Sequence, residues 1–175
     1  MNKKPETKFI FLLLAAAFFT YIFHEFGHWI VGEALGNKMI MTLNFTYPKK
    51  GTYIHDWDTT YILIGGPFFT ILQALAVFYL ILKYNKLFLY PFLFFAFFIR
   101  FFGLVFAFSI EDEAKISSSL QIGTFTVPLI VVLILSLLIW RGSVLLKLDI
   151  KFNLFCFAYS TIFLIIVVNL DKLLF

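Results

Sequence analysis

Long apolar runs separated by short polar stretches make up most of this chain. A bilayer core about 30 Å thick requires about 20 helical residues at about 1.5 Å each. Five runs meet that length, so we predict an all-α multi-pass membrane protein with five transmembrane helices. The predicted helices cover residues 9–31, 60–82, 87–110, 123–140 and 152–170.

The segment between the first two predicted helices follows a different pattern. Apolar side chains occupy every second position over 39–47, the period of a strand with one apolar face. Pro-Lys-Lys-Gly at 48–51 predicts a turn, and residues 52–57 then predict the returning strand. We therefore expect a membrane-surface β-hairpin after the first helix, with a disordered polar loop as the alternative.

The composition agrees with a membrane protein. Hydrophobic residues make up 62% of the chain and charged residues 14%, against about 45–50% and about 25% in soluble domains. This excludes a water-soluble globular domain, and 175 residues predict a single membrane domain covering 1–175. The one cysteine, Cys156, cannot form an internal disulfide. Basic residues do not alternate with aromatic ones, so we expect no nucleic acid as a partner. The apolar composition leads us to expect the lipid bilayer and a membrane protein as partners.

The net charge of +4 bears on membrane orientation, because cytoplasmic loops carry an excess of Lys and Arg. On the N-terminal side of five spans lie eight such residues: Lys3, Lys4, Lys8, Lys83, Lys86, Arg141, Lys147 and Lys151. On the other side lie five: Lys38, Lys49, Lys50, Lys115 and Lys172. The difference favours a cytoplasmic N-terminus, and we expect the cell (plasma) membrane as the location.

The first predicted helix contains an ionisable cluster, His24-Glu25-Phe26-Gly27-His28, which fits the pattern HExxH. An acidic or basic side chain inside a span costs about 2.5–3.5 kcal/mol on insertion scales, so the cluster indicates function. Residues four apart share a helix face, so His24 and His28 can bind one Zn²⁺. We assign Glu25 as the general base toward a water at the zinc. A hydrated structural cluster at the helix end is the alternative.

This motif in a membrane helix, followed by a surface hairpin, resembles the site-2 protease family of intramembrane zinc metalloproteases. A second stretch, Gly-Gly-Pro-Phe-Phe-Thr at 65–70, is similar to the family's Ala-Gly-Pro-Leu-Ala-Asn stretch, which opens the helix after the hairpin. Thr70 stands where the family usually has Asn. The two glycines would let this helix start close to the catalytic helix. The matched elements, and so the expected catalytic core, cover about 9–113.

The resemblance implies a third zinc ligand, an Asp on the third core helix, since zinc takes three protein ligands and keeps an open position in catalytic sites. The third predicted helix runs into Glu111, Asp112 and Glu113, and alternating topology places them on the side of the two histidines. The family's usual Leu-Asp-Gly setting is absent. We assign Asp112 as the ligand, with Glu111 and Glu113 as alternatives and His55 or Asp56 in the hairpin loop as rivals.

Two further polar residues, Gln73 and Arg100, lie within predicted spans. Their helices run antiparallel and place them at similar depth, where they can hydrogen-bond to each other. We interpret them as a structural pair, or Arg100 as a side chain that extends toward the surface.

These observations predict a zinc metalloendopeptidase that cleaves a peptide bond in or near a membrane helix of another protein. The predicted site consists of Glu25 as the catalytic residue and His24, His28 and Asp112 as zinc ligands. A strand edge within 39–47 would hold the unwound substrate by strand addition. One alternative is a non-proteolytic membrane protein of the same fold that acts as a regulatory or binding subunit. The other is a small metal or proton transporter, which the lack of paired charges in several helices disfavours.

Overall fold

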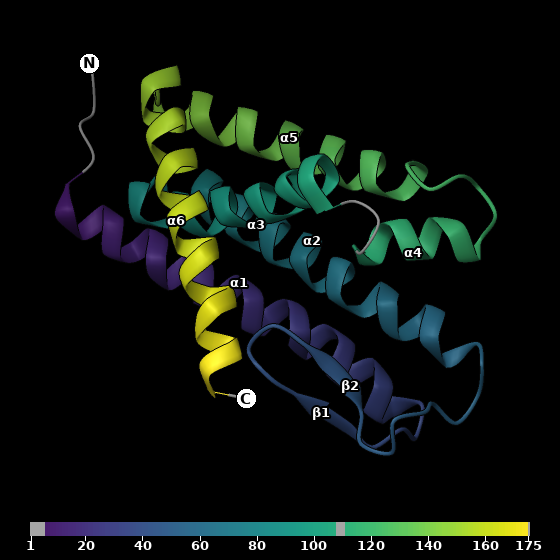
Figure 1. Ribbon diagram of the computed structural model, residues 1–175. Helices are drawn as coiled ribbons and strands as arrows, with labels where there is room; N and C mark the ends of the chain where they lie inside the picture. Colours follow the sequence, from purple (N-terminus) through teal and green to yellow (C-terminus); the bar gives the residue numbers. More distant parts are fainter. Residues whose placement is uncertain (1–5, 108–110, 175) are drawn as a thin grey trace.

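The computed structural model describes residues 6–107 and 111–174, and helices dominate it (Figure 1). Five helical segments in this part of the chain are long and apolar enough to cross a membrane, which agrees with the predicted all-α membrane protein. In chain order the elements are α1 (Thr7–Ala34), β1 (Met39–Met41), β2 (Thr46–Pro48), α2 (Asp58–Tyr84), a 3₁₀ turn (Leu87–Leu89), α3 (Tyr90–Phe102), a π-helical segment (Gly103–Ala107), α4 (Asp112–Ser119), α5 (Thr126–Leu146) and α6 (Ile150–Leu174).

Four of the membrane helices continue past the C-terminal ends that the apolar runs predict. A helix ends where its backbone is capped, and the cap does not have to coincide with the last apolar residue. In α2 and α5 the cap is a residue in the left-handed conformation, Asn85 with φ 49° and Lys147 with φ 55°. The described helical part of the third predicted span covers Leu87–Phe106. Its predicted last residues, 108–110, lie outside the described part of the chain.

The first three membrane helices form the inner part of the bundle. Between 39% and 56% of the most apolar window of α1, α2 and α3 is buried, against 22% in α5 and α6. Ala16 and Ala17 of α1 are fully buried, and such small side chains let membrane helices pack closely. Phe95 and Phe98 of α3 fill the centre of the same core. The outer helices α5 and α6 therefore present mainly apolar side chains outward, as lipid-facing helices do.

The β-hairpin after α1 is present, but its register differs from the prediction. β1 pairs antiparallel with β2, and Ile40 lies opposite Tyr47, so the single strand predicted at 39–47 is in fact two strands, the second of which extends to Pro48. The chain reverses between them, where the Thr42 N–H donates to the Phe45 carbonyl at 2.8 Å. The predicted returning strand at 52–57 is wrong, although the turn at 48–51 does form and closes with a backbone hydrogen bond from residue 51 to residue 48.

A contact from the far end of the chain explains where the hairpin turns. Asp171, in the last turn of α6, accepts hydrogen bonds from the backbone N–H groups of Leu43 at 2.9 Å and Asn44 at 3.2 Å. Figure 1 shows α6 running across α1 and ending beside the hairpin. Alternation along 39–47 is compatible with one long strand, and this tertiary contact stabilises a turn in the middle of it.

The short helix α4 was not predicted, and it changes the setting of the three acidic residues. The sequence predicts that these residues end the third membrane helix. In the structure, however, α3 ends at Phe102 and a π-helical segment follows. Asp112 and Glu113 instead occupy the first turn of α4, where the helix dipole favours negative charge. α4 packs against α2 and α5, and its Asp112 contacts His24 and His28 in the second half of α1.

Candidate metal centre

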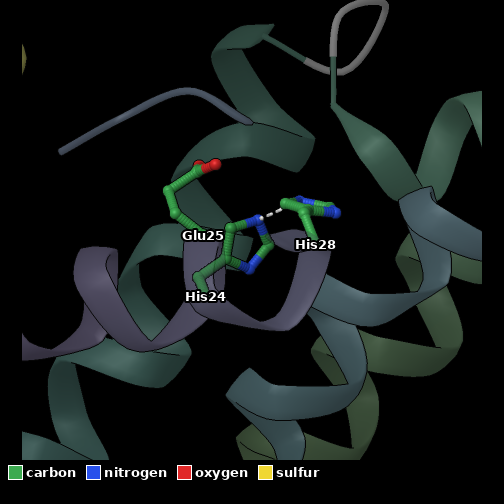
Figure 2. Close-up of side chains that lie close together, drawn as sticks. All are labelled: His24, Glu25 and His28. Atoms are coloured by element: carbon green, nitrogen blue, oxygen red, sulfur yellow. Dashed lines mark hydrogen bonds between the residues drawn. The ribbon is translucent and has the colours of Figure 1, made fainter. Parts of the chain in front are cut away.

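Three buried polar side chains project from one part of α1. His24, Glu25 and His28 are 4–6% exposed, and each offers a ligand atom within 4.8 Å of the other two. Helical spacing accounts for this, since residues four apart lie one above the other on a helix face. The Nε2 atoms of the two imidazoles lie 3.1 Å apart, and the rings are nearly perpendicular to each other. A dashed line joins them in Figure 2. Such a cluster is able to bind a metal ion.

Asp112 is the carboxylate that the fold brings to this pair. Its Oδ2 atom lies 3.0 Å from Nε2 of His24 and 3.1 Å from Nε2 of His28. The other acidic candidates on this segment point elsewhere, because Glu111 and Glu113 form ion pairs with Arg100 at 3.3 and 3.2 Å. The four residues predicted to form the site therefore come together.

The rival candidates in the hairpin loop are not part of this cluster. His55 and Asp56 are both exposed. The His55 ring stacks on Trp57 with the centroids 5.2 Å apart, and its backbone N–H donates to Asp58 at 3.1 Å. Neither residue lines the cavity at the site.

A hydrogen bond at the Nδ1 atom orients each of the two imidazoles. His28 Nδ1 donates to the Ile62 carbonyl at 2.7 Å, which requires the proton on Nδ1. His24 Nδ1 lies 3.0 Å from the Thr70 hydroxyl. That hydroxyl donates its own proton to the Gly66 carbonyl at 3.2 Å, so it accepts from His24. In the neutral imidazoles both Nε2 atoms therefore carry a lone pair that faces the centre of the cluster.

The donor set fits a divalent transition metal. Two imidazole lone pairs and a carboxylate oxygen meet at 3.0–3.1 Å, and a cation or a proton must lie among them to offset their repulsion. Metal bonds of about 2.0–2.1 Å in a tetrahedron place neighbouring ligand atoms about 3.3 Å apart. The observed separations are close to that value. A set of three such ligands leaves the fourth position of a tetrahedral metal free.

Glycines allow α2 to approach the histidines closely. A Cβ atom at Gly66 would lie 2.6 Å from Nε2 of His24 and would also clash with Nε2 of His28. At the neighbouring Gly65 the backbones themselves are close, since a Cβ at Gly27 would lie 2.8 Å from the Gly65 carbonyl carbon. The expected close approach of these glycines to the helix that carries the histidines is present. However, they lie within α2, which begins at Asp58, and do not open that helix.

Glu25 lies beside the metal-binding atoms with part of its carboxylate free. Its Oε2 atom is buried and has no hydrogen-bond partner among the described residues. The backbone carbonyl of Glu25 accepts a hydrogen bond from the Thr46 hydroxyl of β2 at 3.2 Å, which ties the hairpin to this turn of α1. A buried carboxylate oxygen is normally paired. The unpaired oxygen is therefore available to take up a proton.

A cavity of about 620 Å³ opens at the site. His24, Glu25, His28 and Asp112 line one part of it, and residues from β2, α2, α3 and α6 complete its wall. Both polar and apolar side chains contribute, among them Thr46, Tyr53, Ile62, Leu63, Ile99, Arg100 and Leu164. A volume of this order is typical of small-molecule and peptide sites.

The protonation of the carboxyl groups of Glu111 and Asp112 depends on the residues around them. Burial alone would raise the pKa of the Asp112 carboxyl, but when a proton rather than a metal ion lies among the three groups, the contacts with His24 and His28 hold that pKa well below its usual range. Burial raises the pKa of the Glu111 carboxyl, and the Arg100 guanidinium opposes that rise. Asp112 is therefore a carboxylate, the form that a metal ligand needs.

Sequence reasoning missed several contacts around the site. The predicted hydrogen bond between Gln73 and Arg100 is wrong, because Gln73 donates to the Thr20 hydroxyl at 2.8 Å and to the Phe92 carbonyl at 3.0 Å. The contact between Thr70 and His24 was not predicted either. One feature of the sequence could have indicated this contact: Thr70 is a polar residue one helical turn after Gly66, on the same face of α2.

Comparison with protein-family models, with curated proteins and with solved structures finds no match for this chain.

Proposed function

We propose that this protein is a zinc-dependent intramembrane metalloprotease of the site-2 protease type. The observation that carries the proposal is the meeting of His24, His28 and Asp112 at 3.0–3.1 Å beside the unpartnered carboxylate oxygen of Glu25. Three ligands and a free base within a cavity are what hydrolysis of a peptide bond requires. The HExxH order of these residues agrees with this proposal.

His24, His28 and Asp112 would hold the metal, and zinc suits a set of two imidazoles and one carboxylate. When bound, zinc supplies Lewis acidity, which polarises the peptide carbonyl and acidifies the attacking water. Thr70 and the Ile62 carbonyl keep the imidazoles in the tautomer that leaves Nε2 free for the metal.

Glu25 would act as the general base. Its free oxygen removes a proton from the attacking water while the water oxygen bonds to the carbonyl carbon of the substrate. The bond between that carbon and the amide nitrogen then breaks, and Glu25 transfers the proton to the leaving amine. The products are a carboxylate and an amine, so the reaction consumes one water and needs no other reactant.

The substrate would be an extended segment at the end of another protein's membrane helix. Backbone carbonyls in a helix are hydrogen-bonded, so the helix must unwind before cleavage. β2 borders the cavity through Thr46, and among the described residues no strand other than β1 pairs with it. Strand addition to β2 would align the peptide with the site.

The location proposed for the protein is the plasma membrane, with the N-terminus in the cytoplasm. The excess of Lys and Arg on the N-terminal side supports this orientation. The site would then lie near the outer surface, because α1 carries His24 and His28 toward the end opposite the N-terminus. Site-2 proteases generally open toward the cytosol, so the resemblance favours the reverse orientation.

The test uses the full chain reconstituted in vesicles with a panel of model membrane helices whose ends contain helix-breaking residues. We expect new termini, identified by mass spectrometry, that require Glu25, disappear with a zinc chelator and return with added zinc. The matched control is Glu25→Gln. Bound zinc with no cleavage of any helix in the panel would contradict proteolysis and favour a binding or regulatory subunit. Zinc movement into the vesicles would favour a transporter.

A further inference from the structure

A second charged cluster lies beside the metal site and has no role in the chemistry above. Arg100, in the last turn of α3, is 6% exposed. Its Nη1 atom lies 3.3 Å from Glu111 Oε2 and 3.2 Å from Glu113 Oε2. Glu113 is 3% exposed, so the ion pair between Arg100 and Glu113 is almost completely buried. Burying such charges is costly, and in some proteins a buried pair is retained because it fixes one arrangement of the chain.

The two glutamates flank the proposed metal ligand in the sequence. Glu111 precedes α4 as its N-cap residue, and Asp112 and Glu113 are the first residues of the helix. Both glutamate side chains reach Arg100 on α3, whereas the Asp112 carboxylate between them reaches His24 and His28 on α1. One cation thus holds the residues on either side of Asp112. With both neighbours fixed, the backbone of Asp112 has little freedom to rotate its carboxylate away from the histidines.

Packing supports the same interpretation. α4 packs mainly against α2 and α5, so its connection to α3 depends largely on the Arg100 ion pairs. Glu111 also lies against Gly103, where a Cβ atom would be 2.5 Å from the glutamate carboxyl carbon. Gly103 begins the π-helical segment, and such segments are frequent at functional sites. The absence of a side chain at this position lets Glu111 approach α3.

Charge balance also requires the arginine. Three consecutive carboxylates meet at the edge of a low-dielectric region, and like charges in such a place repel strongly. Lys115 is exposed, so Arg100 is the buried cation that offsets them in the described structure. Without it, the acidic segment would be expected to move toward water. Asp112 would then move away from the histidines.

We propose that Arg100 is a positioning residue, which holds Asp112 at the metal by binding the carboxylates of Glu111 and Glu113 on both sides of it. This inference rests on the proposed metal site but not on proteolysis. Residues that support a metal ligand typically change metal affinity by about 10–100-fold when they are replaced. Arg100 is expected to have an effect in that range.

The experiment measures metal binding by the full chain, purified in detergent, with Zn²⁺ and Co²⁺ as probes. Zinc affinity comes from competition with a chelator, ligand geometry from the visible spectrum of bound Co²⁺, and stability from thermal unfolding of the metal-free protein. We expect Arg100→Gln to weaken Zn²⁺ binding by about 10–100-fold and to alter the Co²⁺ spectrum. Arg100→Lys, which keeps the charge without the planar fork, should recover part of the affinity.

Tyr90→Phe is the matched control, because Tyr90 is a buried polar residue at the other end of α3. It should lower stability and leave Zn²⁺ affinity and the Co²⁺ spectrum unchanged. If Arg100→Gln does not fold, Glu113→Ala is measured in its place. This variant keeps the ion pair between Arg100 and Glu111, so it should disturb folding less. Zinc affinity should then fall by about tenfold or more.

The outcomes separate this inference from the proposed function. Wild-type zinc affinity in folded Arg100→Gln, or in Glu113→Ala when the first variant fails to fold, would overturn the role of Arg100. A wild-type chain that binds no zinc would overturn the proposed function and this inference together. Weakened zinc binding in the variants, with no peptide cleavage by the wild type, would support the role of Arg100 and contradict only proteolysis.

Discussion

The two ends of α3 each bury polar side chains, and the two clusters differ in kind. At its first residue, the Tyr90 hydroxyl lies 2.6 Å from Ser143 of α5 and donates to Asn153 of α6. The Asn153 amide in turn donates to a backbone carbonyl at 3.0 Å, so every polar side-chain atom in this cluster has a partner. At the opposite end, Oε2 of Glu25 and Nε of Arg100 are buried and have no hydrogen-bond partner among the described residues.

This difference agrees with a structural role for the Tyr90 cluster and with the functional role proposed for the charged one. Buried polar groups are almost always hydrogen-bonded, since leaving one unpaired costs about 1–3 kcal/mol. The Tyr90 cluster is neutral and satisfied, as expected for a contact that joins three helices. The cluster at the metal centre is charged, borders a cavity and retains unpaired atoms, which is typical of sites that bind or transform a ligand.

The largest expected effect concerns Glu25. Glu25→Gln removes the base and keeps the shape of the side chain, so cleavage should fall by about 10²–10⁴-fold. Zinc content, measured by elemental analysis, should stay close to the wild-type value because Glu25 is not assigned as a ligand. Loss of zinc from this variant would show instead that Glu25 is a ligand.

The next effect separates the acidic neighbours at the site. Asp112→Ala should weaken zinc binding by more than the 10–100-fold typical of a supporting residue, because it removes a ligand. Glu111→Ala should have a smaller effect, since Glu111 contacts Arg100 at 3.3 Å and not the histidines. Chelator competition on both variants measures the difference. Equal affinities would argue against Asp112 as the third ligand.

A methyl group at Gly66 should disturb the site through packing alone. In Gly66→Ala the new Cβ meets both imidazoles, so α1 and α2 must separate or the histidines must turn. Overpacking of this kind costs about 1–3 kcal/mol, and zinc affinity should fall by about tenfold or more.

The matched control for this variant is Gly142→Ala in α5, near the Tyr90 end of α3. Its new Cβ would meet a flexible methyl group of Leu93 at 2.9 Å, which can move. Zinc affinity should be unchanged there. A similar loss of affinity in both variants would mean that general loosening of the bundle, and not contact with the histidines, weakens the site.

A smaller effect is expected at the satisfied cluster. Tyr90→Phe removes a hydroxyl that makes two hydrogen bonds, so the free energy of unfolding should fall by about 1 kcal/mol. Peptide cleavage and zinc content should remain at wild-type levels. Thermal unfolding in detergent, followed by circular dichroism, measures the change. Loss of zinc from this variant would show that the two ends of α3 are coupled.

The last prediction determines on which side of the membrane each end lies, and it should not change activity. Single cysteines replace Lys50, in the turn after β2, or Lys86, between α2 and α3, in a Cys156→Ser background. Both lysines are exposed. The count of basic residues predicts that an impermeant thiol reagent labels position 50 in intact cells and spares position 86. The reverse pattern would place the metal centre on the cytoplasmic side, as in site-2 proteases.

Much of the fold could be predicted because it depends on local properties of the chain. Apolar length determines which segments are long enough to span a bilayer, and five such segments were identified, with errors at their ends. Helical periodicity alone places His24 and His28 on one face of α1. The β-hairpin was predicted in the correct segment, but alternation with a period of two is the same for one long strand and for two short ones.

The tertiary structure decided which residues complete the site. Glu111, Asp112 and Glu113 are chemically similar neighbours, and their different roles depend on where Arg100 and the histidines lie in space. The partners of the His24 and His28 Nδ1 atoms come from α2, 46 and 34 residues away. Asp171 reaches the hairpin turn from more than 120 residues away. Periodicity and hydropathy describe how a residue relates to its neighbours in the chain, whereas ligands and hydrogen bonds depend on which helices pack together.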